Sequence, residues 1–147
     1  MKDFIQQADS LFKDLDNNIS LLANASAFLN EIIPDINWVG FYLLVNGKLH
    51  LGHFQGKVAC TPIKLTDGVC GHAFTTKKLT NVPNVHEFEG HIACDEMSKS
   101  ELVIPLIKDG KAFGVLDVDS PIYDRFDVKT TKLINEIAKV IVKYYII

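Results

Sequence analysis

An Asn46-Gly47 pair between two strand-like runs is the feature that most constrains the fold of this chain. The run before it, Asn37 to Val45, is rich in aromatic and β-branched residues, and Lys48 to Gln55 follows at once. An Asn-Gly pair favours the two-residue turn whose twist matches that of two antiparallel strands. The chain is therefore expected to fold around an antiparallel hairpin.

Side chains along the first strand of this hairpin should alternate between two faces. One face would carry Trp38, Gly40, Tyr42 and Leu44, and the other Val39, Phe41, Leu43 and Val45. Trp38 and Tyr42 would then form an aromatic wall suited to an apolar or sulfonium-like group. Ordinary core packing is the alternative, and for Tyr42 it is the simpler one.

Both ends of the chain have the apolar period of amphipathic helices. One helix is expected from Asp3 to Asp16, a second from Leu21 to Ile33 before Pro34, and a third from Val128 to about Ile146, capped by Asp127. Two apolar strands, Glu101 to Ile107 and Lys111 to Asp119, precede the last helix.

This order of elements predicts an α+β fold with an antiparallel sheet, N- and C-terminal helices on one face and site-bearing loops on the other. We expect a single domain over residues 1–147. It would comprise a helical segment 1–34, a sheet and site region 35–126, and a C-terminal helix 127–147.

Composition excludes several classes of function. The chain is 48% hydrophobic and 22% charged with a net charge of −3, so no basic field favours nucleic acid or anionic lipid. No apolar run reaches the roughly 18 residues of a membrane span, and the N-terminus lacks the pattern of a signal peptide. A cytoplasmic protein is expected.

Three cysteines are an odd number, so structural disulfides cannot use them all. Cys94 lies in a long polar loop, Asn84 to Ser100, and such loops tend to be functional. Its polar neighbours suggest an exposed, reactive thiol, although an incidental loop cysteine is the alternative. Cys60 also lies in a loop and could reach Cys94.

Cys70 should occupy the first turn of a short helix, either as a stabilised thiolate or as a small buried apolar residue.

The cysteine and histidine spacings contain no C-x-x-C pair and no zinc knuckle, and no glycine-rich phosphate loop is present. We therefore expect neither a metal nor a cofactor. A Ser-His-Asp site also lacks its usual sequence markers.

Asp117 and Asp119 interrupt an apolar strand and should share a face, because they are two residues apart. Glu101 joins them only in one register. A two-residue Asp109-Gly110 turn would pair Glu101 with Val118 and aim Glu101 at the opposite face. A three-residue loop with a bulge at Gly110 would instead pair Glu101 with Asp117, and we predict this loop.

Three carboxyl groups this close cannot all ionise easily, so at least one pKa should rise. The cluster would hold a ligand ammonium group and keep one acid protonated for catalysis. The helix start at Gly68-Val69-Cys70-Gly71 would receive a ligand carboxylate on its backbone amides. These parts together suit a small zwitterion.

Six motifs occur in order between about Asn37 and Asp127, a span that contains all three cysteines: residues 38–42 (WVGFY), 51–56 (LGHFQG), 68–71 (GVCG), 82–86 (VPNVH), 90–95 (GHIACD) and 114–120 (GVLDVDS). Together they resemble the GAF-domain free methionine-(R)-sulfoxide reductases. His53, where that pattern is expected to have proline, and residues 57–59 depart from it without touching a proposed catalytic group.

The resemblance implies that Cys94 attacks the sulfoxide sulfur of free L-methionine (R)-sulfoxide and is left as a sulfenic acid. Cys60 would resolve it as a disulfide, with Cys70 a further possible partner, and thioredoxin would reduce that disulfide. Glu101, Asp117 and Asp119 would between them bind the ammonium group and protonate or polarise the sulfoxide oxygen, and Trp38 would hold the methyl end. A homodimer is implied too.

Two other functions remain open. A GAF-type sensor or binding module would use its cysteines to report oxidants, but the 147 residues contain no linker, coiled coil or output domain. A structural zinc domain would need metal near stoichiometry. The resemblance favours the reductase over both.

Overall fold

The computed structural model describes residues 1–92 and 94–147; Ala93, which belongs to the GHIACD motif, lies outside them. The described residues form one antiparallel sheet of six strands in the order β3-β2-β1-β6-β5-β4. The elements in chain order are α1 (Lys2–Phe12), α2 (Asn18–Ile32), β1 (Trp38–Val45), β2 (Lys48–Gln55), β3 (Ile63–Lys64), α3 (Gly68–Thr76), β4 (Thr80–Val82), a 3₁₀ turn (Val85–Glu87), β5 (Ser100–Lys108), β6 (Lys111–Ser120) and α4 (Val128–Tyr144).

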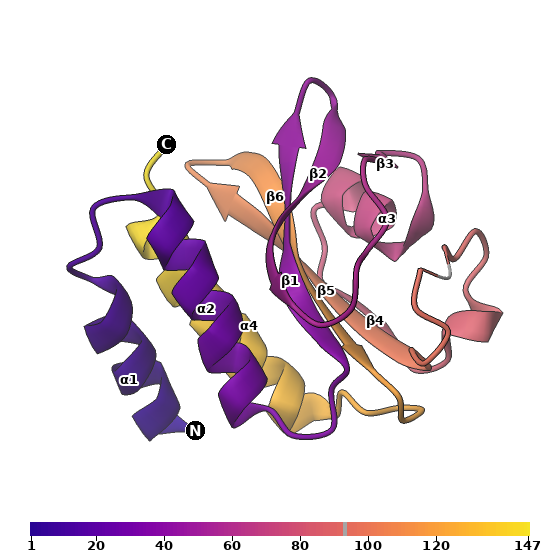
Figure 1. The fold of residues 1–147 in the computed structure, drawn as a ribbon, viewed down its shortest axis with the longest axis horizontal. Coiled ribbons are helices and arrows are strands. Elements are labelled where there is room, and N and C mark those ends of the chain that lie inside the picture. Colours follow the sequence, from indigo (N-terminus) through magenta and orange to yellow (C-terminus); the bar gives the residue numbers. More distant parts are fainter. Residues whose placement is uncertain (93) are drawn as a thin grey trace.

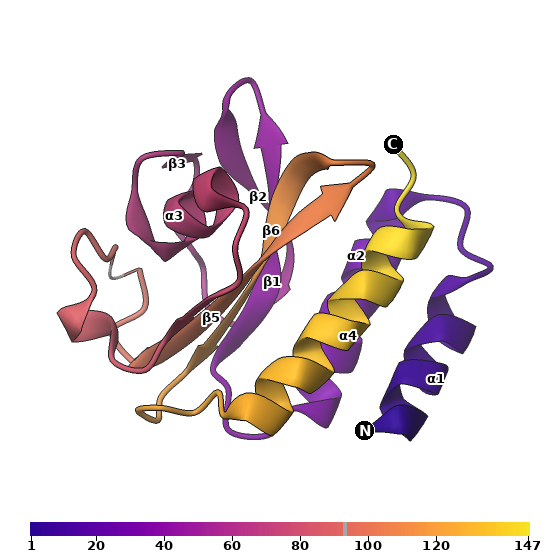
Figure 2. The ribbon, with the colours of Figure 1, turned by 180° about the vertical axis from the view of Figure 1, so that it is seen from behind.

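The sheet separates two layers of unlike character. Helices α1, α2 and α4 lie together on one side, and α3 lies on the other with the loops around it (Figures 1 and 2). This arrangement confirms the predicted α+β fold with terminal helices on one face. Each layer also has its own buried cluster, one under α2 and α4 and one under α3.

Helix ends follow the local sequence signals. The Asn17 side chain accepts a hydrogen bond from the Ser20 amide at 2.8 Å, and Asp127 accepts one from Thr130 at 2.8 Å. Side-chain oxygens at these positions satisfy amides that have no partner inside the helix. Pro34 follows α2 as expected. None of the helices in the described residues is long and apolar enough to cross a membrane.

The β1–β2 hairpin has the predicted two-residue turn. Asn46 and Gly47 both have positive φ, 52° and 78°, and the strands pair from Val45 and Lys48 onward. The expected alternation holds as well: Trp38 and Tyr42 belong to the cluster under α3, whereas Val39 and Phe41 belong to the cluster under the terminal helices.

The β5–β6 hairpin corrects one prediction. Asp109 and Gly110, with φ of 53° and 79°, form a two-residue turn, so the predicted three-residue loop with its bulge at Gly110 is wrong. The extra residue lies farther along, in β6, because Leu106 pairs with Gly114 while Ile107 pairs with Ala112. This bulge restores the side-chain parity that the short turn alone would have reversed.

The corrected register pairs Glu101 with Asp119, and not with Asp117 as predicted. The predicted convergence of the three carboxylates on one face is nevertheless right. The bulge in β6 therefore decides the face that Glu101 occupies. Phe113, the residue left without a partner, stacks on Tyr145 with ring centroids 4.1 Å apart.

Candidate functional site

Three buried carboxyl groups form the floor of the site. Glu101 on β5 is 7% exposed, and Asp117 and Asp119 on β6 are 6% and 9% exposed. Asp119 pairs with Glu101 on one side and with Trp38 on the other, and directly paired residues of antiparallel strands share a face. The sheet register therefore concentrates three acids beside the aromatic residues of β1.

Burial raises the pKa of Asp117 well above its usual range, and the neighbouring Asp119 and Glu101 carboxyls raise it further. Burial is also the main cause of the raised pKa of Asp119, followed by repulsion from Glu101. Both effects penalise the charged form, so Asp117 and Asp119 retain protons that exposed carboxyls lose. This agrees with the expectation of a raised pKa.

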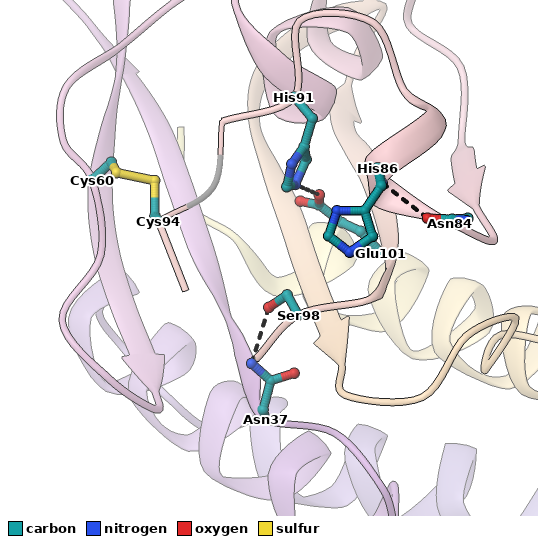
Figure 3. A network of polar contacts seen from close by, with 8 residues as sticks. All are labelled: Asn37, Cys60, Asn84, His86, His91, Cys94, Ser98 and Glu101. Carbon is teal, nitrogen blue, oxygen red and sulfur yellow. Dashed lines mark hydrogen bonds and ion pairs between the residues drawn. A yellow bond between two sulfur atoms is a disulfide. The ribbon is translucent and has the colours of Figure 1, made fainter. Parts of the chain in front are cut away.

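The cluster has little compensating positive charge. Among the described residues its ion-pair contact is His91, whose Nε2 lies 3.6 Å from Glu101 Oε1 (Figure 3). The Oδ1 atom of Asp117 is buried and has no hydrogen-bond partner in the described part of the chain. Buried acceptors are almost always paired in native proteins. An unpaired carboxylate oxygen facing a pocket is the arrangement that a cationic ligand would complete.

An aromatic wall stands beside the acids. Trp38 stacks on Tyr42, with centroids 5.9 Å apart, and on Phe54, with centroids 5.3 Å apart. The Trp38 indole N–H donates to the Lys57 carbonyl at 3.0 Å, and the Tyr42 hydroxyl donates to the Cys60 carbonyl at 3.0 Å. These bonds fix the rings and also attach the Cys60 loop to the sheet.

Phe54 is a member of this wall that the sequence did not indicate. It lies on β2 and reaches Trp38 because Gly40 pairs with Phe54 across a bulge in β2. Only the pairing register of β1 with β2 places Phe54 beside Trp38. The alternation of residues along the sequence does not predict that register, because β2 contains a bulge.

Cys60 and Cys94 are joined by a disulfide, with their Cα atoms 5.7 Å apart (Figure 3). Cys94 is exposed and Cys60 is half-buried, and both lie in loops over the site face of the sheet. Exposure of Cys94 was expected from its polar neighbours. A disulfide between two loops at the surface is open to exchange with an external thiol.

Cys70 differs from the other two cysteines. It lies in the first turn of α3, as expected, but it is buried and carries a free thiol. Burial raises the pKa of this thiol well above its usual value, and the negative charge of Asp117 and Glu101 adds to the effect. Of the two alternatives for Cys70, the small buried residue therefore agrees with the structure and the stabilised thiolate does not, because burial and the acids oppose the negative charge that a helix start favours.

These groups line one pocket. Its described lining includes the three acids, Trp38, Tyr42, Cys70 and Cys94, and further residues that the sequence did not single out for a site: Val58, Ala59, Ile63, Ile92 and Ser98. The start of α3, at Gly68 and Val69, also faces it. The pocket thus combines an acidic floor, an aromatic wall and an apolar rim with a disulfide at its edge.

A polar network holds the Cys94 loop against the sheet. The Asn37 side-chain amide donates to Ser98 Oγ at 3.0 Å (Figure 3) and to Asp95 Oδ2 at 3.0 Å. Asp95 Oδ1 in turn accepts from the Met97 amide at 2.9 Å. Asn37 precedes β1, so the network positions the segment after Cys94 relative to the first residue of the sheet. Sequence reasoning missed this role of Asn37.

Comparisons with known proteins identify the family of this chain. A family model described as "GAF domain" matches residues 21–142. The chain is 50% identical to the free methionine-R-sulfoxide reductase of Escherichia coli over 74% of this chain and 66% of that protein. It is 44% identical to the free methionine-R-sulfoxide reductase of Saccharomyces cerevisiae over 86% of this chain and 75% of that protein.

Solved structures extend the likeness to three dimensions. The fRMsr of Staphylococcus aureus in its reduced form superposes with a TM-score of 0.95 at 48% identity, covering 99% of this chain and 94% of that one. Its complex with substrate superposes with a TM-score of 0.93 at 47% identity, covering 99% and 95%. On these matches, and with all three cysteines in one site region, the chain belongs to the GAF-domain family, within the group that contains the free methionine-R-sulfoxide reductases.

Proposed function

We propose that this protein reduces free L-methionine (R)-sulfoxide to L-methionine. The observation that carries the proposal is the Cys60–Cys94 disulfide at the edge of a pocket with three buried carboxyl groups. A disulfide there is the oxidised product that a thiol-based reduction would leave. The names of the Escherichia coli and Saccharomyces cerevisiae relatives support the same substrate.

The pocket suits each part of this substrate. The ammonium group would lie against Glu101, Asp117 and Asp119, where the unpaired Oδ1 of Asp117 needs a donor. The carboxylate would face the backbone amides at the start of α3, since helix N-termini favour anions. Trp38 would contact the methyl end, with Tyr42 behind it. Free methionine is favoured over a peptide because both charged termini are used.

The chemistry would begin with the Cys94 sulfur attacking the sulfoxide sulfur. The S–O bond of the substrate breaks, methionine leaves, and the oxygen stays on Cys94 as a sulfenic acid. The sulfoxide oxygen must be protonated or strongly hydrogen-bonded for this attack. The raised pKa values of Asp117 and Asp119 supply carboxylic acids that retain a proton where an exposed carboxyl is ionised.

The second stage would regenerate the thiols. The Cys60 thiol displaces water from the Cys94 sulfenic acid, forming the disulfide seen in the structure. Thioredoxin is the proposed reductant: its dithiol exchanges with the exposed disulfide, becomes oxidised, and leaves Cys60 and Cys94 reduced. Cytoplasmic localisation and the homodimer stay predictions beside this proposal.

A turnover assay with four substrates tests the proposal. The protein, thioredoxin, thioredoxin reductase and NADPH are mixed with the R or S epimer of methionine sulfoxide, each free or within a peptide. We expect NADPH oxidation and methionine release with the free R epimer only. Equal turnover of the peptide-bound sulfoxide would contradict the proposed use of both termini.

The same assay separates the enzyme from a redox sensor. A sensor would consume at most one equivalent of oxidant per chain and then stop, whereas an enzyme releases many equivalents of methionine. The Cys94→Ser variant is the control, and it should release none.

A further inference from the structure

Cys70, Glu101 and Asp117 form a compact cluster of possible metal ligands beneath the pocket. One atom from each, the Cys70 sulfur and a carboxylate oxygen from each acid, lies within 4.8 Å of the other two. All three residues are buried, and they come from α3, β5 and β6. No short motif links them, which is why the absence of zinc-type spacings in the sequence did not reveal the cluster.

A second observation, at Asp117, also favours a bound cation. The Oδ1 atom of Asp117 has less than 1 Å² of exposed surface and no hydrogen-bond partner among the described residues, although Asp117 lines the pocket. Asp117 is 94% buried in this position, as its 6% exposure implies. An Asp117 oxygen so placed has no hydrogen-bond donor among the described residues, and a metal ion would satisfy it directly.

We propose that the pocket binds one thiophilic divalent cation, with Zn²⁺ as the type, through Cys70, Glu101 and Asp117. Zinc accepts thiolate and carboxylate ligands in tetrahedral sites, at about 2.3 Å to sulfur and about 2.0–2.2 Å to oxygen. Three protein ligands leave the fourth position for water. Magnesium and calcium are disfavoured because they require oxygen ligands.

Binding would exchange a proton for the metal. The buried Cys70 thiol releases its proton to the buffer as the S–Zn bond forms, and the cation neutralises the carboxylates that otherwise repel one another. Cys60 and Cys94 are bonded to each other, so the oxidised protein offers Cys70 as its free thiol. Metal binding through Cys70 can therefore be measured in the disulfide form, without competition from the thiols of Cys60 and Cys94.

The consequence for activity rests on the proposed function. The metal occupies the acids to which the substrate ammonium group would bind, so Zn²⁺ and methionine sulfoxide exclude each other. Zn²⁺ should act as an inhibitor competitive with substrate and reversible by a chelator.

Cobalt(II) reports the site directly, because its bond to a thiolate gives a charge-transfer band in the near ultraviolet. The full chain in its Cys60–Cys94 disulfide form is titrated with Co²⁺, and Zn²⁺ is then added to displace it. We expect a band that saturates near one equivalent and disappears with Zn²⁺. Absence of a thiolate band, or a band that persists in Cys70→Ser, would overturn the proposal.

Matched variants separate the cluster from adventitious metal binding. Cys70→Ser should lose the band and bind Zn²⁺ at least about tenfold more weakly, as expected for a lost ligand. Asp117→Asn should retain the band and also bind about tenfold more weakly. His72→Gln, which removes an exposed imidazole from the same helix, should change nothing. Thermal unfolding of each metal-free variant checks that it folds.

Competition between Zn²⁺ and the substrate can be measured by binding alone, without turnover. Free methionine, which retains the ammonium group, should raise the apparent dissociation constant of Zn²⁺ in the wild-type protein more than an equal concentration of glycine, which chelates Zn²⁺ in solution in the same way. If metal binds and no reductase activity is found, the metal site stands and the proposed function fails. If turnover is found and Co²⁺ gives no thiolate band, the function stands and the metal site fails.

Discussion

At the scale of single residues, the buried carboxyl groups of Asp117 and Asp119 make the free energy of unfolding depend on pH. The pKa values of Asp117 and Asp119 are raised in the folded protein, so the folded state binds more protons than the unfolded chain above the ordinary carboxyl pKa. Their favourable contribution is fully present below the unfolded pKa and is lost as pH rises through the folded pKa. The site is therefore a source of instability near neutral pH.

Asp117→Asn should relieve this effect. The amide cannot ionise, so we expect the free energy of unfolding at neutral pH to rise by on the order of 1 kcal/mol, a typical size for a point substitution. Denaturant unfolding between pH 4 and 8 should show a smaller decline with pH than in the wild type, while turnover falls. A steeper decline in the variant would contradict the assigned direction of the pKa shift.

Substitution of either cysteine of the disulfide should stop the reaction, but at a different step. Cys94→Ser should abolish reduction completely, because the attacking sulfur is gone. Cys60→Ser should still release about one methionine per chain and then stop at the sulfenic acid, which has lost its resolving thiol. Mass spectrometry of the quenched protein distinguishes the two. Full turnover in Cys60→Ser would show that Cys70 or thioredoxin resolves Cys94 directly.

At the scale of elements, the bulge in β6 is the feature on which the site depends. It lets a two-residue turn coexist with a register in which Glu101 faces the pocket. Gly114 lies at this bulge, and a Cβ atom there would be 2.4 Å from the Tyr42 carbonyl oxygen. This oxygen belongs to the backbone of β1, so it cannot move aside as the end of a flexible side chain could.

Gly114→Ala should therefore destabilise the protein by about 1–3 kcal/mol, the usual cost of overpacking. Gly52→Ala in the other bulge is the matched control, since its nearest atom would be 3.2 Å away. Gly52→Ala should lower the free energy of unfolding by less than Gly114→Ala does. Thermal unfolding of both variants measures the difference, and equal losses would mean that the close approach to Tyr42 is unimportant.

At the scale of the whole molecule, the disulfide links the loop that leaves β2 to the loop that enters β5. It joins residues 34 apart in sequence, and closing such a loop restricts the unfolded chain. Reduction should lower the free energy of unfolding by about 2–4 kcal/mol. Denaturant unfolding with and without a reductant tests this. A Cys60→Ser, Cys94→Ser double variant should be insensitive to the reductant, while Cys70→Ser keeps the difference.

The homodimer expected from the family resemblance also belongs to this scale. Light scattering coupled to gel filtration should give twice the mass of one chain, independent of concentration over the working range. A mass of one chain would contradict it.

The sequence by itself determined the elements and the chemistry they carry. Caps at Asn17 and Asp127 and the Asn46-Gly47 turn act through local backbone bonding, so residue types suffice to predict them. The polar neighbours of Cys94 likewise predicted an exposed thiol. The two-residue spacing of Asp117 and Asp119 predicted that these acids share a face of the sheet. These signals depend on neighbours close in the chain.

Only the tertiary structure decided how those parts meet. The β6 bulge, the stack of Phe54 on Trp38 and the burial of Cys70 beside two acids all depend on pairing between distant segments. A one-residue shift reverses every side chain of a strand, and local preferences hardly distinguish a bulged ladder from a regular one. Burial likewise overrode the helix dipole at Cys70, because desolvation is set by what packs around a group and not by its place in a helix.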